Sequence, residues 1–235
     1  MTAYGEYITL FNLDHLLYIG GLIGLGTALF LNKQTIKEKK ETISTLIILF
    51  SIGQQILLYS SYFYLFDFDL AESLPLHISR INSLLGMWYL LTKNKAVFKV
   101  LCFFGLYAWT SFLYPSRVYG VFHPIGISFF VNHVITLLLP YYGMIVYGER
   151  VEKGDKKTAF FWFLIYLVTA ISVNHLVDGN YFYLKHKPIF AFLPDAIYIP
   201  LLVLFTYLFF TLGYYLYTKI QYALDKESIQ LKNSK

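Results

Sequence analysis

The stretch GGLIGLGTALFLNKQTIKEKKETISTLIILF, residues 20–50, joins two apolar runs through a short connection rich in lysine. The connection, residues 32–42, holds Lys33, Lys37, Lys39 and Lys40. A helix that crosses a bilayer needs about 20 mostly apolar residues. The two runs extend beyond the quoted stretch, over about 13–31 and 43–66, so each is long enough to cross a membrane. The lysines mark the membrane face at which the chain turns back.

The rest of the chain repeats this alternation. Of its 235 residues 57% are hydrophobic, 20% aromatic and only 14% charged, and the mean hydropathy is +0.54. That composition is typical of a membrane protein. Residues 1–12 contain no Lys or Arg, so they do not resemble the basic start of a cleaved signal peptide. Seven candidate spans follow, at about 13–31, 43–66, 75–92, 96–113, 125–147, 158–177 and 196–218. We therefore expect an all-α, polytopic integral membrane protein, a seven-helix bundle forming a single domain over residues 1–235.

The basic residues indicate how the bundle is oriented. Alternate connections and the C-terminal tail hold fifteen of the nineteen Lys and Arg residues. By the positive-inside rule these loops and the C-terminus are cytoplasmic, and the N-terminus lies outside. The net charge of +5 thus reflects membrane topology, and it does not indicate a nucleic-acid partner.

Small residues mark one face of the first span. Gly20 and Gly24 have the small-xxx-small spacing that lets two helix backbones approach closely. The spacing predicts tight packing within the bundle, with a dimer seam as the alternative. The oligomeric state stays open.

Polar residues inside the spans converge on the outer half of the predicted bundle. Ionisable groups buried in a membrane need polar partners or water, and they therefore indicate a functional site. The cytoplasmic halves contain no such residue away from the helix ends. The ionisable members of the outer set are Asp14, His15, His77, Arg80, His133, His175, Asp178 and Asp195.

Spacing and residue type indicate roles for these side chains. His77 with Arg80, and His175 with Asp178, are three residues apart and would share a helix face. An Arg fork suits a phosphate or carboxylate, and a carboxylate beside a His fixes its tautomer for proton transfer. The catalytic candidates are His77, His133, His175, Asp178 and Ser79, and the substrate-binding candidates are Arg80, Asn82, Asn132 and Asp14. Because Ser79 is only two residues from His77, a His on another helix would have to activate it.

Each of these residues also has a purely structural interpretation. Arg80 could pair with Asp14 or Asp178, and a bond to Asn82 or a backbone carbonyl would satisfy His133. A zinc site of three imidazoles lacks any supporting motif, since the chain has neither H-E-x-x-H nor a Cys pair. No metal or cofactor is therefore expected. The single cysteine, Cys102, lies near the cytoplasmic end of its span and is expected in the core.

Three stretches resemble a known family. They are LPLHISRINSLLGMWYLLTKNKAVFKVLCFFGLYAW (74–109), FHPIGISFFVNHV (122–134) and NYFYLKHKPIFAFLPDAIYIP (180–200). They are similar to the YwaF-like integral membrane proteins of bacteria, which look distantly related to the eukaryotic transmembrane protein 164 family. The resemblance covers nearly the whole chain. It implies a seven-helix bundle in a bacterial cell membrane, with His77 and His133 at motif positions.

The resemblance also implies a possible chemistry. The eukaryotic relatives are thought to be lipid acyltransferases that use a cysteine just before the motif histidine, where this chain has Leu76. Bacterial members often have a cysteine at the position of Ser79. This chain lacks a thiol at both positions.

Three classes of function remain open. The first is an enzyme acting on a membrane lipid or acyl substrate, with Arg80 binding an anionic head group. The second is a transporter or receptor for an anion or small solute, although the apolar inner halves disfavour a transport path. The third is a structural partner in envelope assembly, in which the polar groups only hold the helices together.

Overall fold

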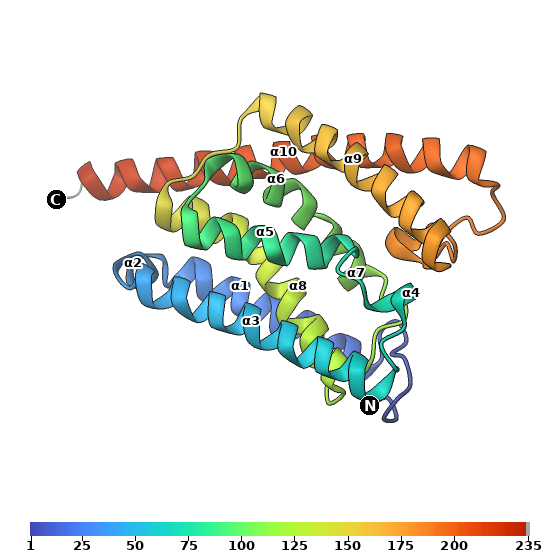
Figure 1. The fold of residues 1–235 in the computed structure, drawn as a ribbon. Helices are drawn as coiled ribbons and strands as arrows, with labels where there is room; N and C mark the ends of the chain where they lie inside the picture. Colours follow the sequence, from blue (N-terminus) through green and yellow to red (C-terminus); the bar gives the residue numbers. More distant parts are fainter. Residues whose placement is uncertain (234–235) are drawn as a thin grey trace.

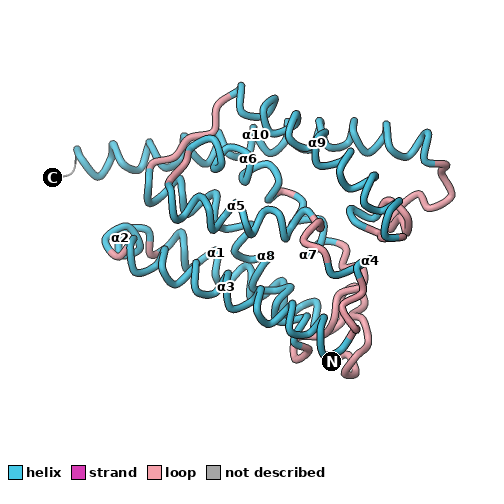
Figure 2. The backbone as a smooth tube through the Cα atoms, in the orientation of Figure 1, coloured by secondary structure: helices cyan, strands magenta, loops and turns pink. Residues whose placement is uncertain are grey.

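The computed structural model describes residues 1–233, and these residues are almost entirely helical. The helices are α1 (Leu13–Leu31), α2 (Lys33–Glu38), α3 (Lys40–Leu65), α4 (Leu70–Ser73), α5 (Ile78–Thr92), α6 (Lys95–Gly105), α7 (Tyr107–Leu113), α8 (Pro124–Tyr142), the π-helical turn η1 (Gly143–Tyr147), α9 (Lys153–Val177), the 3-10 turn η2 (Tyr181–Tyr183) and α10 (Asp195–Asn233). Long helices run beside one another along the molecule, and loops gather mainly at its two ends (Figures 1 and 2).

Six segments in the described part are long and apolar enough to cross a membrane. They are Leu13–Leu31, Lys40–Leu65, Lys95–Leu113, Pro124–Tyr147, Lys153–Val177 and Asp195–Glu227. At the third predicted span, 75–92, the helix α5 has only 15 residues and falls short of that length. The prediction of a multi-pass helical membrane protein is confirmed, whereas the count of seven spans is not.

Two of these segments form the centre of the bundle. About two thirds (67%) of the apolar window is buried in the α6–α7 and α8–η1 segments, against 17–28% in the other four. The helix α8 packs against α3, α5 and α6, and α9 packs against α6 and α10. The outer helices therefore turn most of their apolar surface away from the protein, as helices that face lipid do.

Local sequence explains where the central helices begin and bend. Lys93 takes a left-handed conformation (φ 55°) and ends α5, and Asn94 caps α6 by accepting from the backbone N–H groups of Ala96 and Val97. A two-residue turn thus reverses the chain. In α8, Pro140 lacks the N–H that the helix needs, and the widened turn η1 follows it.

The two ends of the bundle differ in charge. The basic connections α1–α3, α5–α6 and η1–α9 and the C-terminal end of α10 lie at one end (Figure 1). Ion pairs of Lys33 with Glu227 and of Arg150 with Asp225 tie α10 to this end. The N-terminus, α4 and the 114–123 connection lie at the opposite end (Figure 1), where the site described below is found.

The glycine face of α1 does not pack within the bundle. A Cβ atom added to Gly20 or Gly24 would meet no atom within 4 Å. Gly21, by contrast, lies against the ring of Phe130 on α8, where an added Cβ would come within 2.5 Å. The prediction that Gly20 and Gly24 serve close packing inside the bundle is therefore wrong, because that face of α1 is open.

Candidate functional site

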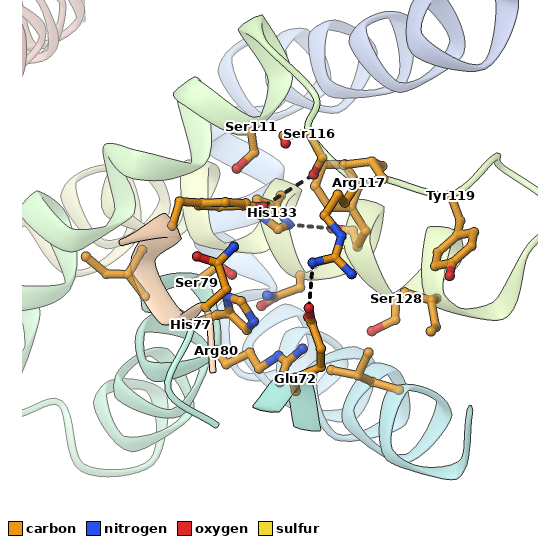
Figure 3. Close-up of a pocket in the computed structure, with 18 of the residues that line it drawn as sticks. Glu72, His77, Ser79, Arg80, Ser111, Ser116, Arg117, Tyr119, Ser128 and His133 are labelled. Atoms are coloured by element: carbon orange, nitrogen blue, oxygen red, sulfur yellow. Dashed lines mark hydrogen bonds and ion pairs between the residues drawn. The ribbon is translucent and has the colours of Figure 1, made fainter. Parts of the chain in front are cut away.

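A cavity of about 480 Å³ opens at the end of the bundle opposite the basic connections. Its walls come from α3, α4, α5, α7, α8 and η2, together with the loops that precede α5, follow α7 and flank η2. The predicted residues that line it are His77, Ser79, Arg80, Asn132 and His133. Figure 3 shows four of them, His77, Ser79, Arg80 and His133, around the same hollow. Residues from separate helices thus meet in one pocket.

Arg80 is buried in the cavity wall without a carboxylate partner in residues 1–233. Its Nη1 donates to the backbone carbonyls of Glu72 (2.9 Å) and Leu74 (2.8 Å). Its Nη2 donates to the hydroxyl of Tyr62, whose ring it also overlies. The alternative of an ion pair with Asp14 or Asp178 is wrong, because neutral oxygens hold the guanidinium. No carboxylate in the described residues pairs directly with this guanidinium, which can therefore bind an anionic ligand.

A second arginine lies across the cavity from this wall. Arg117, from the connection after α7, forms a half-exposed ion pair with Glu72 (Nη1–Oε1 2.6 Å; Figure 3). The same Glu72 accepts from Arg80 through its backbone oxygen. Asp69 also lines the cavity, so the two acidic and two basic lining residues balance in number, and Arg80 is the one of the two arginines without a carboxylate within ion-pair distance in the described residues.

His133 is oriented by its own helix. Its Nδ1 lies 2.8 Å from the backbone oxygen of Phe129, one turn earlier on α8, and the ring packs on the Phe129 ring. A carbonyl oxygen can only accept, so Nδ1 carries the proton and Nε2 of the neutral ring is an acceptor. No side chain or backbone group in the described part bonds to that second nitrogen. His133 therefore offers a lone pair to whatever occupies the cavity.

His77 occupies the N-cap position of α5 but does not cap the helix. Its ring lies edge-on to Tyr181 (centroids 5.1 Å apart) and near Tyr183. Burial lowers the pKa of His77 well below its ordinary value, and the nearby positive charge of Arg80 lowers it further. The imidazole is therefore neutral near pH 7 and can accept a proton.

Two buried oxygens in the cavity wall have no hydrogen-bond partner in the described residues. They are Ser73 Oγ and Asn132 Oδ1, whose residues are 0% and 5% exposed. Leaving such a group unpaired costs about 1–3 kcal/mol. Both residues line the cavity, but the two oxygens themselves are buried, so a polar ligand supplies the missing partners only if these side chains turn toward it.

Ser79 adds a hydroxyl to the cavity. It lies on the first turn of α5, is partly exposed and makes no hydrogen bond within residues 1–233. Tyr183 adds a phenol, which donates to the backbone oxygen of Ser116 (3.3 Å), and burial raises its pKa. Both groups are neutral donors beside the neutral imidazoles.

The predicted pair of His175 and Asp178 lies outside the cavity. His175 is exposed on α9, which ends at Val177. Asp178 follows in a left-handed conformation (φ 53°) and pairs with Lys185 Nζ at 2.6 Å, which lowers its pKa. The assumption that residues three apart share a helix face fails here, because Asp178 is no longer in the helix.

Two predicted binding residues are also structural in their contacts. Asp14 is buried and accepts from the backbone N–H groups of Thr2 and Val121, which ties the N-terminal segment to the loop before α8. Asn82 is buried beside Gly105 on α6, away from the cavity lining, and its Oδ1 has no hydrogen-bond partner in the described residues. The positions of Asp14 and Asn82 outside the cavity depend on how the helices pack, which residue spacing along one helix does not predict.

Several lining residues were not among the predicted ones. Glu72 lies in the short helix α4 and Arg117 in the connection after α7, and Tyr62 lies near the end of α3, where aromatic residues are expected at the membrane interface. One signal for Arg117 was available, because it is among the four basic residues outside the basic connections. Glu72 and Tyr62 carry no comparable signal, since their role depends on contacts across the fold.

No group of three or more His, Cys, Asp or Glu side chains among the described residues is placed to bind a metal. His175 lies apart from His77 and His133, so the three-imidazole set is not assembled. Cys102 is fully buried in the main hydrophobic cluster, as expected from its position in α6.

Comparison with known proteins gives one match. The profile of the TMEM164 family matches residues 10–217, which include all the helices that form the cavity. No curated protein and no solved structure matches the chain.

Proposed function

The chain belongs to the TMEM164 family, and from this premise we propose that its cavity binds a membrane lipid or acyl substrate and catalyses acyl transfer or hydrolysis. In this proposal His133 is the general base and Arg80 binds the anionic group of the substrate. His77, Ser79 and Asn132 complete the site. His175, Asp178, Asp14 and Asn82 take no part in it.

The observation that carries the proposal is the orientation of His133. Its bond to the Phe129 carbonyl leaves an accepting nitrogen on a neutral ring within a cavity that also holds a guanidinium with no directly paired carboxylate in the described residues. A His in a fixed tautomer beside an anion-binding group is a common arrangement for general base catalysis. The structural interpretation of His133, a bond to a backbone carbonyl, accounts for Nδ1 alone and leaves Nε2 without a partner in the described residues.

The proposed step follows from these groups. Nε2 of His133 takes the proton of a hydroxyl, from Ser79, water or an acceptor lipid, while that oxygen bonds to the acyl carbonyl carbon. The carbon–oxygen bond to the leaving alcohol then breaks, and the imidazolium returns its proton to the alcohol oxygen. If Ser79 attacks, the product is an acyl-serine; His133 then takes the proton of water or of an acceptor lipid, whose oxygen bonds to the acyl carbon while the Ser79 oxygen leaves and regains the proton. Acyl transfer and hydrolysis therefore differ only in whether an acceptor lipid or water finally takes the acyl group. The absence of a thiol at Leu76 and Ser79 makes a hydroxyl the expected nucleophile.

We further propose that the cavity faces the cell exterior. The basic connections lie together at the other end, which the positive-inside rule assigns to the cytoplasm. In this orientation the N-terminus is outside, and α5 completes the alternation as a short seventh crossing. Labelling of single cysteines introduced at Thr2 and Lys153 in intact cells tests it: an impermeant thiol reagent should reach only position 2.

A turnover assay tests the chemistry. The purified protein is placed in vesicles of phosphatidylglycerol and phosphatidylethanolamine, and free fatty acid and newly acylated lipid are measured by mass spectrometry. Wild-type protein should form product, and His133→Ala should not. His175→Ala is the matched control, since it removes an exposed imidazole outside the cavity. Equal turnover by wild type and His133→Ala would exclude the proposed base.

Binding without chemistry is the second candidate function. The unpaired oxygens of Ser73 and Asn132 favour it, because they indicate a polar ligand but no reaction. Under this alternative the vesicles yield no product with any variant. An anionic ligand then raises the melting temperature of the wild type but not of Arg80→Gln.

A further inference from the structure

A second hollow of about 220 Å³ lies on the lipid-facing side of the wall that contains Arg80. It runs between α3 and α5. From α3 it is lined by Ile52, Gln55, Ile56 and Tyr59, and from α5 and the preceding loop by Pro75, Arg80, Leu84 and Met87. Positions 52, 55, 56 and 59 lie on one helix face, and so do 80, 84 and 87. The hollow is thus a groove between two helices, which we call the α3–α5 groove.

The groove is open to the surrounding membrane. Ile52, Ile56 and Leu84 are 44%, 63% and 49% exposed, and all three lie in apolar helical segments. Acyl chains are the only abundant apolar solvent for such a surface in a bilayer. An acyl chain can therefore lie along it.

Arg80 connects the groove to the main cavity. Among the described residues it alone lines both hollows. Its guanidinium is buried and is held by neutral oxygens, so it has no carboxylate counterion in the described chain. A ligand with an anionic group at Arg80 can extend an apolar chain into the groove and a polar group into the cavity.

Gln55 gives a second indication of a polar ligand at the groove. Gln55 is half-buried on α3, and its amide makes no hydrogen bond within residues 1–233. An unpaired amide at a lipid-facing position is costly, because hydrocarbon offers it no partner. An ester carbonyl near the start of an acyl chain would accept from this amide.

We propose that the α3–α5 groove holds one acyl chain of an anionic phospholipid, and that the lipid enters the cavity sideways from the bilayer past Arg80. The size of the cavity decides between lipid types. A fatty acid would end at Arg80 and leave the hollow of about 480 Å³ beyond it to water, whereas a phospholipid would place its head group there, beside the polar side chains of the lining. The reaction of the bound lipid rests on the proposed function, whereas its binding in the groove does not.

Photo-crosslinking in vesicles tests the groove. The protein is reconstituted in phosphatidylcholine containing a trace of phosphatidylglycerol with a diazirine at the end of one chain. After irradiation, labelled peptides are quantified by mass spectrometry. We expect labelling of segments 52–59 and 84–87 at least fivefold above that of α1, where Ile23 is 62% exposed to the same lipid. Equal labelling of α1 and the groove would mean ordinary contact with bulk lipid and would overturn the proposal.

Substitutions in the groove test whether the lipid acyl chain lies there. Leu84→Trp fills the groove and should lower its labelling at least fivefold. Leu91→Trp is the matched control, because Leu91 is on the same helix, is 71% exposed and does not line the groove. If Leu84→Trp does not give a monodisperse protein, Met87→Trp makes the same test. Unchanged labelling in the groove-filling variant would overturn the proposal.

Two further measurements test the choice of head group and the proposed chemistry independently. A diazirine fatty acid should label the groove at least fivefold less than the phospholipid probe, and the reverse order would overturn the choice of phospholipid. His133→Ala should keep the full labelling. If His133→Ala has unchanged turnover and the groove is still labelled, the proposed chemistry is wrong and the proposal of lipid binding in the groove is supported.

Discussion

Two buried histidines near the same end of the bundle differ in how their rings are bonded. His15, near the start of α1, has both nitrogens occupied: Nδ1 accepts from the backbone N–H of Phe11 (2.9 Å), and Nε2 donates to the backbone oxygen of Phe112 (2.7 Å). His133 has one nitrogen bonded to Phe129 and the other free of any protein partner in the described residues. The first ring holds the fold together, and the second is available to a ligand.

The same difference extends to the regions around the two histidines. At the N-terminal junction, formed by residues 2–18 and 118–126, buried Asp14 and Tyr18 bond to backbone groups. In the cavity wall, Ser73 Oγ and Asn132 Oδ1 have no partner in the described chain. Buried polar groups with hydrogen-bond partners stabilise the fold, whereas buried polar groups without partners lower its stability. Three further side-chain atoms that are unpaired in the described residues lie outside the cavity, so an unpaired atom indicates a ligand site only where its residue also lines a cavity.

The largest expected effect is on catalysis. We expect His133→Ala to lower turnover of the lipid substrate by roughly 10²–10⁴-fold, the usual contribution of a positioned general base. His15→Ala should leave the turnover of the folded fraction unchanged, since His15 does not line the cavity. Turnover per folded molecule, measured for both variants, checks the comparison, and equal losses would show that the two histidines have the same role.

The next effect is on the packing of the N-terminal junction. A Cβ added to Gly126 would lie 2.1 Å from the backbone oxygen of Gly120 and 2.6 Å from the hydroxyl of Tyr18. Because backbone cannot move aside cheaply, Gly126→Ala should lower the free energy of unfolding by about 3 kcal/mol. Gly20→Ala is the control, as its added Cβ meets open space. Denaturation in detergent measures both, and equal stability of the two variants would contradict the close contact.

A smaller loss is expected from the structural histidine. His15→Ala leaves the N–H of Phe11 and the carbonyl of Phe112 without partners, which should cost roughly 2 kcal/mol. His175→Ala, at an exposed site, should change stability by less than about 0.5 kcal/mol. Thermal unfolding of the two variants separates these expectations. A stable His15→Ala protein would mean that water replaces both bonds.

The smallest effect has the opposite sign. Ser73→Ala removes a hydroxyl that is buried without a partner, so it should raise the free energy of unfolding by about 1 kcal/mol. The same change should weaken the protection that anionic lipid gives against heating. A loss of stability in lipid-free protein would show that the hydroxyl is bonded in the fold and is not reserved for a ligand.

Periodicity and spacing predicted much of this molecule but not the partners of its polar groups. The positions of the helices and the grouping of basic residues follow from hydropathy and charge. His77, Ser79, Arg80, Asn132 and His133 were predicted together and do line one cavity. The pairing of His175 with Asp178 failed because the helix ends one residue earlier. Glu72 and Tyr62 were missed because they act on Arg80 from other elements.

The sequence by itself determined that the chain is a bundle of membrane helices with its cations at one end, because solvation of apolar and charged groups depends mainly on residue type. Only the tertiary structure decided which polar residues are bonded within the protein and which face a cavity. That distinction depends on distances of about 3 Å between helices, and these are set by packing and not by composition. His15 and His133 illustrate it: both are buried, and only their neighbours differ.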